Sequence, residues 1–226
     1  MVYREFSLIF STPRMNRYLH ACGGSTKRAM TLYRKNLKLS QELFTIISCF
    51  EIALRNKINN ECCNNFGNDW LRDAASNGGA FNNVNCQATS SIINQVVRNL
   101  RPYSHNKVVA ELGFGFWRYM YAPHQFNAMG RCLLRIFPSK PRSSAAMQYN
   151  STYVFNQLAD INEIRNRIAH HEPICFTQGT NTIDTNYARD NYHKIIELFN
   201  WMDINHRSLL YGIDHVEQIC NQIDHI

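Results

Sequence analysis

The chain has 226 residues, of which 45% are hydrophobic and 12% are aromatic. This composition can bury a sizeable core, which excludes wholesale disorder, and the few glycines and prolines favour helices over a turn-rich β-sandwich. The sequence has 24 lysines and arginines against 17 aspartates and glutamates, a net charge of +7. A basic excess of this kind favours an acidic partner, with nucleic acid as the first candidate.

The eight cysteines are scattered along the chain and form no C-x-x-C pair. They are therefore predicted to be reduced core residues rather than zinc ligands or disulfides. The longest apolar stretch, Leu43–Leu54, is interrupted by Glu51 and is too short to cross a bilayer. The first residues show no apolar secretory signal. We therefore expect a soluble, cytoplasmic protein that needs no metal, cofactor or membrane.

Two short helices are predicted first. Thr12-Pro13 is typical of a helix start, and this helix ends near Ala21, before the glycines at 23 and 24. Ser25 can cap a second helix that reaches about Lys35.

A long amphipathic helix is predicted next, from about Ser40 to Cys62. Its apolar residues recur at steps of three and four, which is helical spacing. They are Leu43, Ile46, Ile47, Phe50, Leu54 and Ile58. Glu51 and Arg55 lie four residues apart on this helix and can form an ion pair.

The middle of the chain is less regular. Residues 64–86 are rich in asparagine and glycine and are predicted to be a loop, which Trp70 and Leu71 attach to the core. A helix is predicted from about Gln87 to Leu100. Two glycines among aromatics at 113–117 suggest close backbone packing at a bend, with RNA stacking by Phe116 or Trp117 as the alternative.

Further helices are predicted over 125–136, 149–171, 187–202 and 213–226, with a basic linker at 138–146. No strand pattern is evident. The sequence therefore predicts an all-α protein with a single domain, 1–226. An N-terminal lobe, 1–137, and a region that carries the chemistry, 147–226, are possible subdivisions that are not independent.

One segment carries candidate chemistry, the end of the helix predicted over 149–171. Each helical residue advances by about 100°, so Arg165, Asn166 and His170 fall within an arc of about 140°. Ile164 and Ile168 lie on another face and can bury. The helix can therefore dock through its isoleucines while its polar arc faces a cleft.

This trio suits RNA cleavage without a metal. The ribose 2′-hydroxyl must lose a proton, and the 5′-oxygen leaving group must gain one. Histidine titrates near neutral pH and can move protons, while arginine holds a phosphate in a fork of donors. The simpler interpretation is that cations favour a helix C-terminus, and an isolated R-x4-H match is common by chance.

The surrounding segments strengthen the functional interpretation. They occur in order along most of the chain: Phe10-Ser-Thr-Pro-Arg-Met-Asn-Arg-Tyr-Leu19, Ala29-Met-Thr-Leu-Tyr33, Phe50-Glu-Ile-Ala-Leu-Arg-Asn56, Leu112-Gly-Phe-Gly-Phe-Trp117, Phe137-Pro138 and Arg165-Asn-Arg-Ile-Ala-His-His-Glu-Pro-Ile174. With these segments the chain resembles the Abi-like (AbiD/AbiF-type) abortive-infection proteins, within the HEPN superfamily of helical ribonucleases. The resemblance implies a HEPN-type helical bundle with additional N-terminal and inserted helices.

The resemblance also implies a function. It makes Arg165 and His170 the catalytic pair and Asn166 their polar companion in a metal-independent endoribonuclease, a toxin of anti-phage defence. HEPN nucleases usually combine two such motifs, and this chain has one. The resemblance therefore implies a homodimer with a composite site. It further implies RNA as substrate and a small noncoding RNA as partner, with no DNA expected.

Several other residues are candidates to support this site. Glu163 can accept a hydrogen bond from the imidazole, and His171 either assists catalysis or caps the helix end. Glu51 and Arg55 either support the site or form an ordinary surface pair. Candidate RNA-binding cations in and near the middle of the chain are Arg118, Arg131, Arg135, Lys140, Arg142 and Arg167.

Two alternatives stay open. The first is a non-catalytic RNA-binding or adaptor protein on the same bundle, which would form a tight, salt-sensitive complex without product. The second is a nucleotide transferase, for which the sequence offers no glycine-rich phosphate loop and no carboxylate pair.

Overall fold

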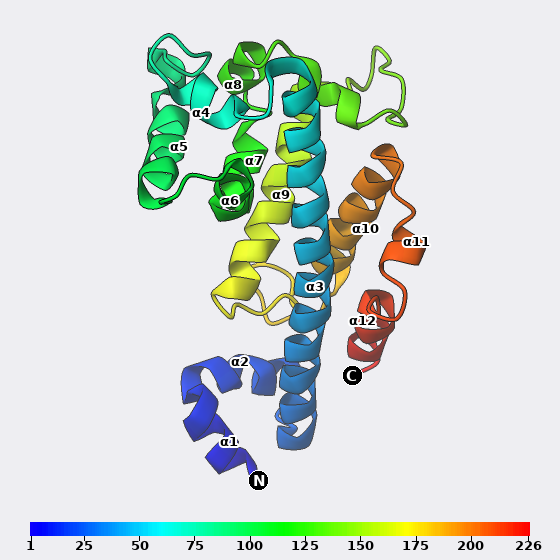
Figure 1. The fold of residues 1–226 in the computed structure, drawn as a ribbon. Helices are drawn as coiled ribbons and strands as arrows, with labels where there is room; N and C mark the ends of the chain where they lie inside the picture. Colours follow the sequence, from blue (N-terminus) through cyan, green and yellow to red (C-terminus); the bar gives the residue numbers. More distant parts are fainter. The chain divides into compact units, whose positions relative to one another are not determined.

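The computed structural model describes residues 1–226, and Figure 1 shows its helices in chain order. The helices are α1 (Tyr3–Phe10), α2 (Thr12–Ala21), α3 (Thr26–Phe66), α4 (Trp70–Ala75), η1 (Val84–Cys86), α5 (Gln87–Asn99), α6 (His105–Glu111), α7 (Phe114–Tyr119), α8 (Pro123–Ala128), η2 (Cys132–Ile136), α9 (Ser151–Ala169), α10 (Asn186–Trp201), α11 (His206–Leu209) and α12 (Val216–Asp224). The chain forms no strand, only an isolated bridge between Phe176 and Ile183. The prediction of an all-α fold is confirmed.

The helices group into two compact units. Unit 1 comprises residues 1–48, 163–196 and 206–226, and unit 2 comprises 49–162 and 197–205. Helices α3, α9 and α10 each contribute residues to both units. The grouping therefore follows packing rather than chain order, and a single domain over 1–226 stays a prediction.

Helix α3 replaces the two helices predicted over 25–35 and 40–62. It runs unbroken for 41 residues, so the predicted gap at 36–39 is wrong. No glycine or proline interrupts it. The side chain of the buried Asn36 is hydrogen-bonded while its backbone stays helical. The Oδ1 of Asn36 accepts a hydrogen bond from the backbone N–H of Ile174 at 2.9 Å. The predicted start is confirmed, because the Oγ of Ser25 accepts from the N–H of Arg28 at 3.4 Å.

The core of unit 1 joins the N-terminal helices to the segment that follows α9. The ring of Tyr18 on α2 packs edge-on against Tyr33 of α3 and Phe176, with both centroid distances 5.1 Å. Arg17 places its guanidinium over the Phe176 ring at 4.4 Å and donates to the carbonyl of Thr180 at 2.6 Å. These contacts hold the chain just beyond α9 against α2.

The core of unit 2 is built around aromatic rings. Phe50 on α3 packs against Phe114 and Phe199, with centroids 6.2 and 5.4 Å away. Trp70 and Leu71 are fully buried, which confirms that they attach the 64–86 segment to the core. That segment is not all loop, however, because α4 and η1 form within it. Burial of the Trp70 and Leu71 side chains stabilises the short α4, which local composition does not favour.

Two further predictions in unit 2 are wrong. The helix predicted over 125–136 is interrupted after α8, because Gly130 and Arg131 adopt left-handed backbone angles with φ of 61° and 59°. The close backbone packing expected at 113–117 is absent. A Cβ added to Gly113 or Gly115 would meet no atom within 4 Å. Gly113 instead caps the start of α7, and Trp117 is buried, where it cannot stack on RNA.

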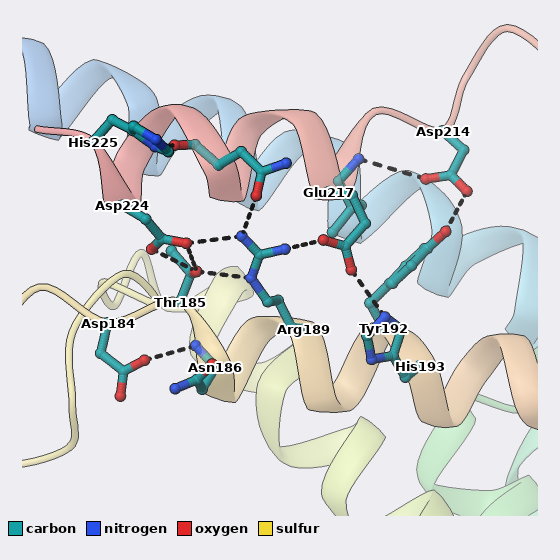
Figure 2. A network of polar contacts seen from close by, with 12 residues as sticks. Asp184, Thr185, Asn186, Arg189, Tyr192, His193, Asp214, Glu217, Asp224 and His225 are labelled. Carbon is teal, nitrogen blue, oxygen red and sulfur yellow. Dashed lines mark hydrogen bonds and ion pairs between the residues drawn. The ribbon is translucent and has the colours of Figure 1, made fainter.

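A polar network joins α12 to α10 inside unit 1, as Figure 2 shows. Arg189 on α10 forms ion pairs with Glu217 and Asp224 of α12, the latter at 2.8 Å. Its Nε also donates to the Oγ1 of Thr185 at 3.1 Å, and Thr185 in turn donates to Asp224 at 2.8 Å. Together with the buried apolar face of α12, this network fixes the C-terminal helix to unit 1.

The cysteines are all free. Six of the eight are buried, as predicted for core residues, and Cys49 and Cys63 are half-buried. None of the helices combines the length and the apolar character that crossing a membrane requires.

Candidate active site

The predicted motif lies at the C-terminal end of α9, in unit 1. The isoleucine face of this helix is buried as the spacing predicts, with Ile164 fully buried and Ile168 nearly so. The helical register continues one residue beyond α9, since the N–H of His170 donates to the carbonyl of Asn166 at 2.9 Å. Asn166 and His170 therefore lie one turn apart on the same face.

Arg165 and Asn166 are held to each other. The Nη1 of Arg165 donates to the Oδ1 of Asn166 at 3.3 Å, and both side chains are half-buried. The Nε of Arg165 is buried without any hydrogen-bond partner. A buried donor of this kind is costly unless an acceptor meets it. Asn166 thus positions the guanidinium, and the buried Nε has no acceptor within the chain.

His170 is exposed, and its imidazole makes no hydrogen bond within the chain. The hydrogen bond expected from His170 to Glu163 does not form. Glu163 instead accepts from the Nε2 of Gln178 at 3.5 Å. The physical reason is helical rise, because seven residues separate the two side chains by about 10 Å along the axis.

His171 closes the helix. Its φ of 57° is left-handed. Its N–H donates to the carbonyl of Ile168 at 2.9 Å, and the next N–H, that of Glu172, donates to the carbonyl of Arg167 at 2.8 Å. This is the Schellman arrangement, with His171 in the position that usually holds glycine. The Nη1 of Arg14 on α2 donates to the His171 carbonyl at 3.0 Å. These backbone contacts give the main chain of His171 a structural role at the helix end, and assistance of catalysis by its imidazole stays a prediction.

Arg167, a candidate RNA-binding residue, is engaged inside unit 1. Its Nε lies 3.2 Å from the Glu172 carboxylate, and its Nη2 donates to the carbonyl of Pro173 at 2.9 Å. Its guanidinium also lies over the Tyr187 ring, 4.9 Å from the centroid. These contacts fasten the turn after α9.

Glu51 and Arg55 belong to unit 2, on the half of α3 that lies beyond residue 48. Both are half-buried, and the predicted ion pair between them does not form. The Nε of Arg55 is buried without a partner. A support role for these two residues stays a prediction.

The remaining candidate RNA-binding cations also belong to unit 2. Arg118 lies over the Phe155 ring at 4.4 Å, Arg131 donates to Asn127 at 2.8 Å, and Arg135 pairs with Glu61 at 3.4 Å. Lys140 is half-buried and Arg142 is exposed. Arg118, Arg131 and Arg135 are thus in contact with other side chains of unit 2.

Sequence reasoning missed a second basic region, which lies in the same unit as the motif. Residues 1–48 contain eight lysines and arginines against two acidic residues, a net charge of +6. The basic residues are Arg4, Arg14, Arg17, Lys27, Arg28, Arg34, Lys35 and Lys38. A count of charge in successive windows would have found this region. It did not stand out because the middle of the chain is equally basic.

A shallow groove adjoins the motif. It is lined by residues of α3 and of the end of α9, and its volume is about 310 Å³. The lining residues are Leu37, Ser40, Gln41, Phe44, Ile168, Ala169 and His171. No group of three or more His, Cys, Asp or Glu side chains in the structure is placed to hold a metal ion.

A family model described as Abi-like protein matches residues 2–175, which include α1 to α9 and the whole motif. The chain belongs to the Abi-like protein family. Membership suggests that this Abi-like protein has a role in abortive infection. No curated protein and no solved structure matches it significantly. In this Abi-like protein α10 to α12 lie outside the matched residues, yet most of α10 and all of α11 and α12 belong to unit 1 with the motif.

Proposed function

We propose that this Abi-like protein is a metal-independent endoribonuclease that acts as a toxin in anti-phage abortive infection. One observation carries the proposal. At the end of a single helix, the half-buried Arg165 is hydrogen-bonded to Asn166, and the exposed His170 follows Asn166 by one turn. Family membership supports the biological role.

The proposed reaction is a transfer within the RNA strand. The 2′-hydroxyl oxygen attacks the adjacent phosphorus and gives its proton to an imidazole, while the bond from phosphorus to the 5′-oxygen breaks and that oxygen takes up a proton. The products are a 2′,3′-cyclic phosphate and a 5′-hydroxyl. Arg165 stabilises the charge that develops on the phosphoryl oxygens, and Asn166 fixes the guanidinium without titrating.

The proposal includes a second copy of the chain. One histidine cannot at the same moment be the base for the attacking oxygen and the acid for the leaving oxygen. Two copies of Arg165 and His170 facing one cleft would supply both functions. We further propose that a small noncoding RNA binds the protein and restrains or guides it.

The test is cleavage of total cellular RNA by purified protein in the presence of EDTA. Wild type is expected to produce fragments with 2′,3′-cyclic phosphate ends, and Arg165→Ala and His170→Ala are expected to lose them while remaining folded by circular dichroism. His20→Ala is the matched control, because His20 is also an exposed histidine and lies on α2.

Other results would reject the proposal. Cleavage that survives both substitutions, or that requires a divalent cation, contradicts the assigned chemistry. A tight, salt-sensitive RNA complex without any product would favour the alternative, a non-catalytic RNA-binding protein on the same helices.

A further inference from the structure

The groove beside the motif is lined by two large apolar side chains that the fold leaves exposed. Leu37 and Phe44 of α3 are 42% and 39% exposed, whereas the opposite face of the helix is fully buried. The other wall is the end of α9, formed by Ile168, Ala169 and His171. Apolar side chains that line a concave surface with a few polar groups form a candidate ligand-binding surface.

The lining of the groove, which is mostly apolar with an aromatic ring and a few polar side chains, favours a nucleobase. Leu37, Gln41 and Phe44 are spaced by four and three residues, so they share one face of α3. Phe44 offers a ring on which a base can stack, and Ser40 and Gln41 offer donors and acceptors to the edge of a base. A volume of about 310 Å³ is at the small end of the range for ligand sites. It suits one base better than a peptide helix.

The rim of the groove is basic. Arg34 is exposed three residues before Leu37, and its guanidinium lies over the Phe6 ring, 5.0 Å from the centroid. On the other side Arg14 donates to the carbonyl of His171 and is itself exposed. Phosphates can therefore contact the rim while an uncharged base occupies the groove.

From these observations we propose that the groove between α3 and the end of α9 binds one unpaired nucleobase of an RNA strand, next to the position of cleavage. The inference rests on the proposed ribonuclease function. Because His171 lines the groove and His170 precedes it directly, a base held there presents its ribose and phosphate to the motif. The groove then determines which nucleotide lies beside the scissile bond.

The test measures RNA binding in a His170→Ala background, so that cleavage does not enter. A fluorescein-labelled single-stranded 12-mer of mixed sequence and its duplex are titrated by anisotropy. Phe44→Ala is expected to weaken single-strand binding by about tenfold, as for loss of one stacked base, and to leave duplex binding unchanged. Phe44→Trp is expected to keep single-strand binding near the wild-type level, since the larger ring can still stack on a base. Ile92→Ala, at an exposed apolar residue of α5, is the matched control and is expected to have no effect.

Three outcomes would overturn the inference: single-strand affinity that Phe44→Ala leaves unchanged, equal loss for strand and duplex, or conversion of a dimer into monomers by Phe44→Ala in light scattering. The last outcome would make the groove an interface between copies. Crosslinking of a 4-thiouridine RNA gives a readout without any variant, and labelled peptides should contain 37–44 or 168–171.

The two proposals can fail separately. If wild type cuts no RNA but binding depends on Phe44, the ribonuclease proposal fails and the base site stands. If wild type cuts RNA and Phe44→Ala changes neither binding nor cleavage, the base site fails and the ribonuclease stands.

Discussion

The guanidinium of Arg14 donates a hydrogen bond to the backbone carbonyl of His171 at 3.0 Å, across 157 positions of the sequence. His171 is the left-handed residue that ends the motif helix. This contact ties α2 to the turn immediately after Arg165 and His170. The orientation of the motif in unit 1 thus depends on a residue near the N-terminus.

Removing this contact should loosen the turn. Arg14→Ala is expected to lower the free energy of unfolding by about 0.5–1.5 kcal/mol, the usual net contribution of one hydrogen bond. Amide hydrogen exchange at 171–174 should accelerate. Arg28→Ala, at an exposed arginine near the start of α3, is the control. Equal exchange rates in wild type and Arg14→Ala would show that the contact does not hold the turn.

Arg165 should not be replaceable by lysine. Lysine keeps the positive charge but lacks the planar fork that contacts Asn166 and a phosphate together. Arg165→Lys is expected to stay folded and to reduce the cleavage rate by about 10²- to 10³-fold, the range for loss of a positioned donor. Single-turnover kinetics measure the rate, and near-normal cleavage by Arg165→Lys would contradict the assigned role.

The network of Arg189 should stabilise the C-terminal helix. The side chain is only 17% exposed and is paired with Glu217 and Asp224. Because Arg189→Met leaves Asp224 without its cation and leaves Glu217 with His193 alone, 2.9 Å away, we expect a loss of about 1–3 kcal/mol, between the values for exposed and buried pairs. Urea denaturation measures it. Arg72→Met breaks the exposed pair with Asp69 and should cost clearly less, because exposed pairs contribute little.

Glu42 should make stability depend on acid pH. Burial raises the pKa of this carboxyl. Hydrogen bonds from Lys38 and His215 lower the pKa by more than burial raises it, so it lies below its ordinary value of 4.5. A carboxyl with a lowered pKa in the folded state stabilises the fold above its unfolded pKa. That contribution is lost as the pH falls through the folded pKa.

The corresponding test compares wild type with Glu42→Gln by urea denaturation from neutral pH to about pH 3. Wild type is expected to be more stable near neutral pH, and the difference should shrink below pH 4.5, the ordinary value for this carboxyl. Glu111→Gln, at an exposed glutamate of α6, is the control. A difference that is constant with pH would contradict the role of Glu42.

Two glycines should respond oppositely to alanine. A Cβ at Gly79 would collide with the carbonyl oxygens of Asp73 and Ala74, so Gly79→Ala is expected to cost about 1–3 kcal/mol. A Cβ at Gly115 meets nothing, and this residue lies inside α7. Gly115→Ala is therefore expected to stabilise the protein by about 0.5–1 kcal/mol. Thermal unfolding measures both, and destabilisation by Gly115→Ala would indicate that the backbone needs glycine there.

Local sequence determined the longer amphipathic helices and their buried faces. In α9 the apolar residues recur at steps of three and four, and all five are buried: Val154, Leu158, Ile161, Ile164 and Ile168. The same spacing placed Asn166 and His170 on one face. These features depend on helical geometry alone, and so a single sequence suffices to predict them.

Only the tertiary structure decided which partner each polar side chain has. Asn36 stays inside a continuous helix because Ile174 donates to it from 138 residues away. Arg167 is engaged by Glu172 and Pro173, and Glu51 and Arg55 stay apart although their spacing permits a pair. Periodicity encodes which side of a helix is apolar, but polar contacts depend on which distant segments pack together. The sequence therefore determined the long helix that carries the motif and its buried face, while packing determined the short helices and the surroundings of Arg165 and His170.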